Sequence, residues 1–413
     1  MSRPLRIAAL SDITIGYAVP QIQSMVAALC AHYAPAEGFI LEPDMKGRRE
    51  LATIAGIAIT RLLTRMPPHD HAFHVEYNIQ LHRALDRIAP DVVVFLNASV
   101  VPALLLSRHK PAFVIYYMLE SLSHQLTAGG QDYLDLNQMV RDQVDVVVVP
   151  EYRRAELDLE RLNWPAKPVV EMLNVAAFDP PGSDPPGSDP PPSDPPPCDL
   201  PPCDLPPCDR PPCDRPPCDR PTECAFLHAG TIGADTYCTE LADDGLGEVR
   251  IDFAGPIDSE ESRAIVARLA SYPGTRQYLG LLPASRLHEI MPRYAYRLVL
   301  WRPADYHTLY ASPNKMFESI AAGIPPVCTP HPQCVEILRE FDCGLLLDDW
   351  SREALFRAIG TAQEIFGRPR YAELVANCRK AFENALNWGD QFAALRPLLP
   401  PLEELRPNDQ QSR

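Results

Sequence analysis

A lysine and a glutamate lie three residues apart in the stretch 312–325, which reads Ser-Pro-Asn-Lys-Met-Phe-Glu-Ser-Ile-Ala-Ala-Gly-Ile-Pro. On a helix this spacing places the cation of Lys315 and the carboxylate of Glu318 on one surface. A cation in a first turn opposes the helix dipole, unless an anion binds at the same helix end. A nucleoside diphosphate offers a partner to both side chains: its phosphates can bind the cation, and its sugar hydroxyls can bind the carboxylate. The stretch therefore predicts such a site; the alternative is a capped core helix with a solvated Lys–Glu pair.

Local signals in the same stretch predict the helix that positions these side chains. Ser312 is a good N-cap, and Pro313 fits the first helical position. Apolar residues then recur at helical spacing. Gly323 suits a left-handed C-cap, and Pro325 prevents continuation. We expect a helix of about three turns.

The stretch resembles the nucleotide-sugar-binding helix of retaining glycosyltransferases of the GT-B fold, family 4. The resemblance implies that Glu318 bonds the ribose hydroxyls of a sugar donor and Lys315 its diphosphate, with Asn314 in the same site. It also implies retention of anomeric configuration and no metal requirement. The chain departs from the family in one place, because the first carboxylate of the Glu-x7-Glu signature is replaced by Tyr310.

A second candidate phosphate contact is the segment Ala-Gly-Thr-Ile-Gly at 229–233. Here Gly230, Thr231 and Gly233 follow an expected strand, so their backbone N–H groups could hold a phosphate; an ordinary tight turn is the alternative. Members of the family usually carry a basic residue soon afterwards, and residues 234–240 contain none. Arg302 could substitute for it, or be a surface arginine.

The N-terminal part of the chain offers acidic candidates for the acceptor side. Asp12 and Gly16 follow the first expected strand, where the family carries a glycine loop, although the usual Gly-Gly pair is absent. Glu120 follows another apolar strand and is our candidate for general base or acceptor contact. A carboxylate that stabilises a helix N-terminus is the alternative for Glu120. Two further residues before the opening stretch, Tyr306 and His307, could line the approach.

Apolar strands alternate with amphipathic helices in both halves of the chain, which predicts parallel, doubly wound sheets. We expect strands at 6–10, 91–96, 112–118, 145–149, 225–228, 249–254, 296–301, 326–329 and 344–347. We expect further helices at 21–33, 77–88, 260–272, 285–291, 351–366 and 371–386. The predicted fold class is therefore α/β with two Rossmann-like domains of the GT-B plan, and the site lies between them.

A proline-rich pentapeptide repeat separates the two halves and sets the expected domain boundaries. It runs from 179 to 221 and holds nine aspartates against three arginines. Paired prolines and the near absence of apolar residues predict an extended, disordered linker. We therefore expect an acceptor-side domain at 1–178, a nucleotide-sugar-binding domain at 222–400 and a disordered tail at 401–413.

Composition limits the partners. The chain has 413 residues and a net charge of −16, which argues against nucleic acid as the main partner. No apolar stretch is long enough to span a bilayer. We expect a cytoplasmic protein, with peripheral contact at the inner face of the membrane left open. None of the 12 cysteines belongs to a zinc-like pattern, and no paired-aspartate metal motif is present. Both agree with the resemblance, which implies a nucleoside-diphosphate sugar as co-substrate and no metal or other cofactor.

These observations favour a glycosyltransferase that moves a sugar from a nucleoside-diphosphate donor to a hydroxyl of a glycan, lipid-linked or protein acceptor. Two alternatives stay open. One is a nucleotide-sugar epimerase-like enzyme of the same fold, which would need an additional acidic or histidine group at the site. The other is a catalytically weak scaffold protein that recruits partners through the proline-rich repeat.

Overall fold

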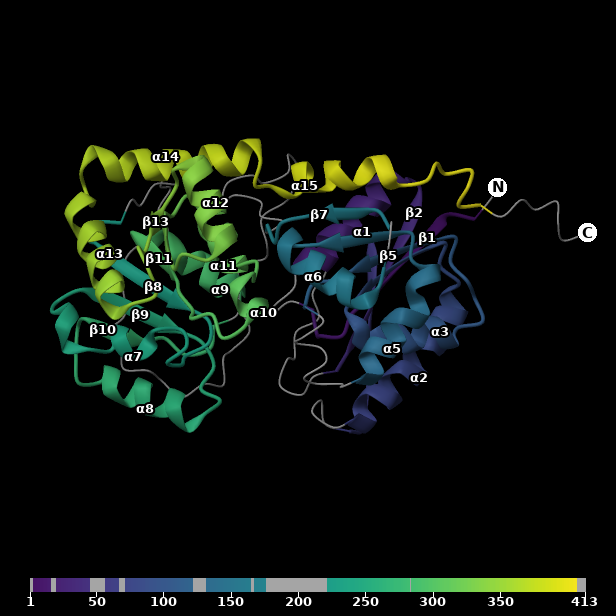
Figure 1. Cartoon of the computed structure of the whole chain (residues 1–413), viewed down its shortest axis with the longest axis horizontal. Coiled ribbons are helices and arrows are strands. Elements are labelled where there is room, and N and C mark those ends of the chain that lie inside the picture. The colour runs from purple at the N-terminus through teal and green to yellow at the C-terminus, as the bar shows by residue number, and fades with distance from the viewer. Residues whose placement is uncertain are drawn as a thin grey trace, which may run out of the picture.

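The computed structural model describes residues 3–15, 20–44, 56–66, 71–121, 131–164, 167–175, 221–282 and 284–406. Within them the chain forms two parallel sheets flanked by helices, each at the centre of one lobe (Figure 1). This confirms the predicted α/β class with two doubly wound domains. Gly16 lies outside the described residues, as does the repeat, except for Pro221.

The N-terminal domain contains a seven-stranded sheet of order β3-β2-β1-β4-β5-β6-β7. Its strands are β1 (Leu5–Leu10), β2 (Ala36–Pro43), β3 (Ile57–Leu62), β4 (Val92–Leu96), β5 (Phe113–Tyr117), β6 (Val146–Val149) and β7 (Val169–Glu171). Its helices are α1 (Pro20–His32), α2 (His71–Ile88), η1 (Ala98–Val100), α3 (Val101–Leu106), α5 (Gln131–Val140), η2 (Arg141–Gln143) and α6 (Tyr152–Leu162). The four expected strands are present, whereas β2, β3 and β7 were not predicted.

The C-terminal domain contains a six-stranded sheet of order β10-β9-β8-β11-β12-β13. Its strands are β8 (Ala225–Ala229), β9 (Arg250–Ala254), β10 (Arg276–Tyr278), β11 (Tyr296–Val299), β12 (Pro326–Cys328) and β13 (Leu345–Leu346). Its helical elements are α7 (Cys238–Leu241), η3 (Asp244–Leu246), α8 (Glu260–Leu269), α9 (Ala284–Ile290), η4 (Met291–Arg293), α10 (Tyr306–Leu309), α11 (Asn314–Ala321), α12 (Pro332–Phe341), α13 (Arg352–Ile365) and α14 (Pro369–Asn384). All five expected strands are found.

Strand register determines which loops meet at the site. In the first sheet Leu10 pairs with Leu41 on one side and with Phe95 on the other, so β1 and β4 end together. In the second sheet Ala229 pairs with Ala254 at the ends of β8 and β9. Because all these strands are parallel, the polar residues that follow them gather at one edge of each sheet.

The end of the chain returns to the first domain. Helix α15 (Trp388–Leu395) and the 3-10 turn η5 (Arg396–Leu398) follow α14, and Figure 1 shows them in yellow along the lobe of the first sheet. Phe392 and Leu395 are buried in the core formed with β1 and α1. Leu405 is only 1% exposed in the same core. The structure thus differs from the expected boundary at 400 and from a disordered tail at 401–406, because apolar side chains there complete the first domain's core.

Candidate functional site

Lys315 lies across Gly230 at the edge of the second sheet. A Cβ at position 230 would collide with Cε and Nζ of Lys315, and φ of Gly230 is 153°. Glycine is therefore required there, both for space and for backbone conformation. The half-buried ammonium makes no hydrogen bond or ion pair with any residue in the described ranges. Burial and then the neighbouring Arg297 lower the pKa of Lys315, because both disfavour the protonated amine.

Two of the three backbone amides of the glycine segment are already bonded within the chain. The N–H of Gly230 donates to the carbonyl of Ala254 at 2.8 Å, and the N–H of Gly233 donates to Thr236 Oγ1 at 3.2 Å. Neither amide is available for a phosphate in this arrangement, because strand pairing and the Thr236 turn use both. The contribution of Gly230 that the structure shows is room for the Lys315 side chain.

The buried imidazole of His228 contacts both the backbone of Thr231 and the thiol of Cys238. His228 Nε2 lies 3.0 Å from the carbonyl oxygen of Thr231 and 3.3 Å from Cys238 Sγ. Burial acts to lower the pKa of His228, but the contact with Cys238 outweighs it and the net shift is upward. Burial acts to raise the pKa of Cys238, yet His228 outweighs it and the net shift is downward. The pair fixes the backbone of Thr231, whose side chain is exposed.

Glu318 is paired with an arginine that the motif did not reveal. Arg297 Nη1 lies 2.7 Å from Glu318 Oε2, and the two side chains are 2% and 21% exposed. Arg297 is in β11, with Met291 Sδ 3.5 Å from the same nitrogen. His288 of α9 is close enough to both charges to be influenced by them, and burial lowers its pKa. One sequence signal could have indicated this pairing: a charged arginine lies inside the otherwise apolar strand Tyr-Arg-Leu-Val.

The guanidinium of Arg302 is already engaged. It donates to the carbonyl of Ala234 at 2.6 Å and to Glu240 Oε1 at 2.5 Å. It also lies over the ring of Tyr237, at 3.9 Å from the centroid. These contacts hold the loop after β8 in place. Diphosphate binding by Arg302 stays a prediction, and it would need the arginine to exchange one of these partners.

Helix α11 begins one residue later than expected. Pro313 is the N-cap and Asn314 the first helical residue, while Ser312 Oγ is buried with no hydrogen bond among the described residues. The carbonyl of Ser312 instead accepts from Asn174 Nδ2 at 3.1 Å. Asn314 Oδ1 accepts from Gln21 Nε2 at 3.2 Å. The expected Ser312 cap is thus replaced by contacts from the first domain. Asn314, predicted to contact the donor, lies at the domain boundary.

On the first domain, Asp12 and Glu120 are joined through Asn97. Asn97 Nδ2 donates to Asp12 Oδ2 at 2.9 Å, and Asn97 Oδ1 accepts from the backbone N–H of Glu120 at 2.8 Å. Ser99 Oγ also donates to Asp12 Oδ2, at 3.2 Å. Asn97 has φ 55°, a conformation that non-glycine residues rarely adopt and that clusters at functional sites. Two predicted acceptor-side residues are therefore in one network, held by a strained asparagine.

Burial makes Asp12 a carboxyl group that titrates near neutrality. Its Oδ1 is buried and accepts no hydrogen bond within the described ranges. Burial raises the pKa of Asp12 from 3.8 to about 6, although its bond with Asn97 acts in the opposite direction. A raised folded-state pKa gives a stabilising contribution that is full below pH 3.8 and is lost as the pH rises through 6.

Replacing Asp12 with asparagine should therefore remove a pH dependence of stability. We expect Asp12→Asn to gain stability relative to the wild type by up to about 3 kcal/mol between pH 4 and pH 7. Urea denaturation at both pH values measures this difference. The control is Asp348→Asn, at an aspartate whose side chain is 74% exposed. An unchanged difference between Asp12→Asn and the wild type at the two pH values would contradict the assignment.

Side chains of the two domains meet beside this network. Ser121 Oγ lies 2.6 Å from His307 Nδ1, and His307 Nε2 lies 3.7 Å from Glu120 Oε2. Tyr306 donates to Asp158 Oδ1 at 2.6 Å. Tyr306 and His307 come from α10, close before α11 in the chain. Ser121 and Asp158 were not predicted, because no local pattern distinguishes them from ordinary loop and helix residues.

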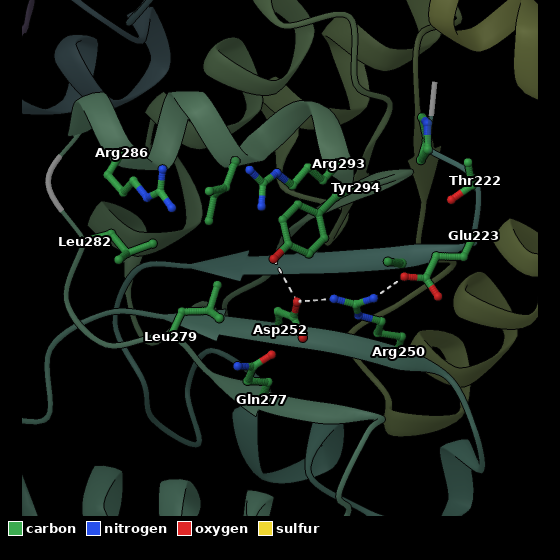
Figure 2. A pocket seen from close by; sticks show the side chains of 13 residues that line it. Thr222, Glu223, Arg250, Asp252, Gln277, Leu279, Leu282, Arg286, Arg293 and Tyr294 are labelled. Atoms are coloured by element: carbon green, nitrogen blue, oxygen red, sulfur yellow. Dashed lines mark hydrogen bonds and ion pairs between the residues drawn. The ribbon is translucent and has the colours of Figure 1, made fainter. Parts of the chain in front are cut away.

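A separate groove of about 590 Å³ lies elsewhere on the second domain (Figure 2). Arg250 at its floor is paired with Glu223 and, at 3.3 Å, with Asp252, which also accepts from the hydroxyl of Tyr294 at 2.8 Å. Arg250 is the first residue of β9, whereas Gly230 follows the last residue of β8. The groove is therefore at the opposite end of the strands from Lys315 and is not part of the candidate site.

Metal-binding clusters and membrane-spanning helices are both absent from the described residues. Within them, no group of three or more histidine, cysteine, aspartate or glutamate side chains is arranged to hold a metal ion. Among their helices, none is both long enough and apolar enough to cross a membrane. The expectation that the reaction needs no metal stays a prediction.

Comparison with known proteins identifies the fold but no sequence family. No protein-family model matches the chain, and no curated protein matches its sequence. A sucrose-phosphate synthase from Thermosynechococcus elongatus superimposes with TM-score 0.65 at 14% identity, over 95% of this chain and 98% of its own. HepE from Anabaena, in complex with UDP and glucose, gives 0.64 at 10% identity, over 95% and 99%.

WaaG, described as a glycosyltransferase involved in lipopolysaccharide biosynthesis, gives TM-score 0.62 at 12% identity, over 96% of this chain and 100% of its own. Each of these alignments covers nearly the whole of both chains. At such low identity the likeness establishes the arrangement of the two domains and not the chemistry. Together with the two parallel sheets whose carboxyl edges gather the polar residues, it shows that this chain has the GT-B fold.

Proposed function

We propose that this chain is a glycosyltransferase that transfers a sugar from a nucleoside-diphosphate sugar to a hydroxyl acceptor, with retention of anomeric configuration. The observation that carries the proposal is Lys315, a half-buried ammonium with no hydrogen-bond or ion-pair partner in the described ranges, in the first turn of α11. A cation in this position is stabilised by an anion bound at the same helix end. Glu318, one turn further on, supplies an acceptor for hydroxyl groups.

The chemistry asked of the second domain is neutralisation of a leaving group. When the bond between the anomeric carbon and the diphosphate oxygen breaks, its electron pair stays on the diphosphate. Lys315 and the amino end of α11 are placed to stabilise that negative charge. The backbone N–H groups at the amino end of the helix already point toward the position of the leaving group, so they need little reorganisation as the charge develops.

The first domain supplies the candidates for the acceptor. Glu120 is 43% exposed and sits beside His307 and the Asp12 network. We assign to its carboxylate the proton that leaves the acceptor hydroxyl as the oxygen bonds to the anomeric carbon. A glycan acceptor, free, lipid-linked or on a protein, presents such a hydroxyl.

The structures that resemble this chain support the same class of donor. HepE is seen with UDP and glucose, and a TarM variant is seen with UDP and a glycerol-linked N-acetylglucosamine. WaaG is named as a glycosyltransferase of lipopolysaccharide biosynthesis. These facts concern those proteins, and they make UDP the first nucleotide to test here.

A second candidate function, a nucleotide-sugar epimerase-like enzyme, is favoured by one observation. It needs an additional acidic and histidine group at the interdomain site, and Asp12, Glu120 and His307 form one. Incubation with UDP-sugars in the absence of acceptor separates the two functions. An epimerase changes the sugar's configuration without any acceptor, whereas a transferase releases nucleoside diphosphate and does so faster when acceptor is added.

Thermal stabilisation by UDP, GDP and ADP tests the donor site directly. A nucleotide at about 100 times its dissociation constant should add about 2.7 kcal/mol to the free energy of unfolding of the wild type. We expect one of the three to do so and Glu318→Ala to lose most of the effect, because the ribose hydroxyls lose their charged acceptor.

The matched control is Glu340→Ala, at an exposed glutamate of α12, which should keep the full shift. No stabilisation of the wild type by any of the three nucleotides would reject the proposed function and favour the scaffold alternative. Turnover measured with and without EDTA tests the metal expectation; a rate lost in EDTA and restored by a divalent cation would contradict it.

A further inference from the structure

The buried Arg297 contacts the inner side of the Glu318 carboxylate, to which we assign the ribose hydroxyls. Arg297 is 2% exposed and is among the largest fully buried side chains of the described residues. Removing a guanidinium from water costs several kcal/mol, so a buried arginine needs an anion or several hydrogen-bond acceptors to offset that cost. The anion here is Glu318, at 2.7 Å. Arg297 Nε has no hydrogen-bond partner within the described ranges, so the pairing with Glu318 is its main compensation.

The two oxygens of Glu318 face different surroundings. Oε2 contacts Arg297 in the interior, whereas the side chain keeps 21% of its surface exposed. Within the described ranges no hydrogen bond or ion pair of Oε1 is found. A carboxylate held from behind in this way cannot rotate freely, and its outward lone pairs have a fixed direction.

We propose that Arg297 is a positioning residue that fixes Glu318 so that its outward oxygen selects a ribose over a deoxyribose nucleotide. This inference rests on the proposed function and deepens it from nucleotide binding to recognition of the 2′-hydroxyl. Arg297 touches no ligand in this account; it acts through the orientation of the Glu318 carboxylate. A ligand that lacks the donor hydroxyl should bind about ten-fold or more weakly to a site with an oriented, charged hydrogen-bond acceptor.

The experiment compares two ligands on several variants. Dissociation constants are measured by calorimetry for the nucleoside diphosphate that the wild type binds, among UDP, GDP and ADP, and for its 2′-deoxy form. The wild type should bind the 2′-deoxy form at least about ten-fold more weakly. Arg297→Met should reduce that ratio to about two-fold. Arg297→Lys, which keeps the charge without the planar fork, should reduce it by at least about three-fold.

A matched control separates positioning from general damage. Arg276 is also buried in the second domain, at 4% exposed, and donates to backbone carbonyls such as that of Leu241 at 2.8 Å. Arg276→Lys should lower stability and leave the ribose-to-deoxyribose ratio at its wild-type value. If Arg297→Met does not fold, Arg297→Lys decides the question.

The outcomes are distinct. A wild type that binds none of the three nucleotides defeats the proposed function itself. A wild type that binds one of them with a ratio near one, or Arg297 variants that keep the full ratio, leave the proposed function intact and overturn the role of Arg297. A ratio that collapses in Arg297 variants and persists in the Arg276 variant supports it.

Discussion

Replacing Lys315 with methionine is expected to weaken nucleoside-diphosphate binding by about 100-fold, or about 2.7 kcal/mol. Methionine keeps an unbranched side chain that can lie across Gly230, and removes only the ammonium. A charged hydrogen bond to phosphate in a partly dry site accounts for a loss of this size. Calorimetry with UDP and uridine checks it, because uridine lacks the phosphates and its affinity should change little.

The same substitution should stabilise the unliganded protein at neutral pH. The pKa of Lys315 is lowered by burial and by Arg297, so the folded state holds its proton less tightly than the unfolded state does. Below the folded pKa the ammonium therefore opposes folding, and an uncharged side chain removes that cost. A variant that binds less nucleotide while unfolding at a higher urea concentration excludes simple misfolding.

Lys380→Met is the matched control, since Lys380 is an exposed lysine of α14. It should change neither nucleotide affinity nor stability by much. If Lys315→Met binds UDP as well as the wild type does, the ammonium is not a phosphate contact. The unpartnered Lys315 then no longer supports the proposed function.

Gly255→Ala is expected to cost more than about 3 kcal/mol of stability. A Cβ at this position would collide with the carbonyl oxygen of Gly230, which is a backbone atom and cannot swing aside. The two strand ends are held in place by the bonds from Gly230 to Ala254 at 2.8 Å and from Gly255 to Gly280 at 3.0 Å. Relief of the clash therefore requires separation of the ends of β8 and β9, where the Lys315 side chain of α11 lies across Gly230.

Urea denaturation of Gly255→Ala and Gly360→Ala measures this effect against a matched substitution. Gly360 lies inside α13, and a Cβ added there would meet no atom within 4 Å, so alanine should add about 0.5–1 kcal/mol. Nucleotide affinity of Gly255→Ala should fall together with its stability. Wild-type stability of Gly255→Ala would show that the close approach of the two strand ends does not exist in solution.

Much of the fold was predictable because its signals are local. Each of the nine expected strands is present, since runs such as residues 92–96 are apolar throughout, as in a buried parallel strand. Strand β2 was missed because its burial is uneven, and β7 because three residues carry too little pattern. The sequence did not indicate that helix α15 packs against the first domain, because local periodicity does not show which domain a helix contacts.

The sequence by itself determined the helix with Lys315 and Glu318 on one surface, since the spacing of apolar residues and the left-handed Gly323 act within a few residues. Only the tertiary structure decided what these side chains meet. It placed Arg297 behind Glu318 and brought Ser121 within 2.6 Å of His307, across 186 residues of chain. Such contacts depend on the burial and pairing of distant segments, which sum over the whole core rather than over any one stretch.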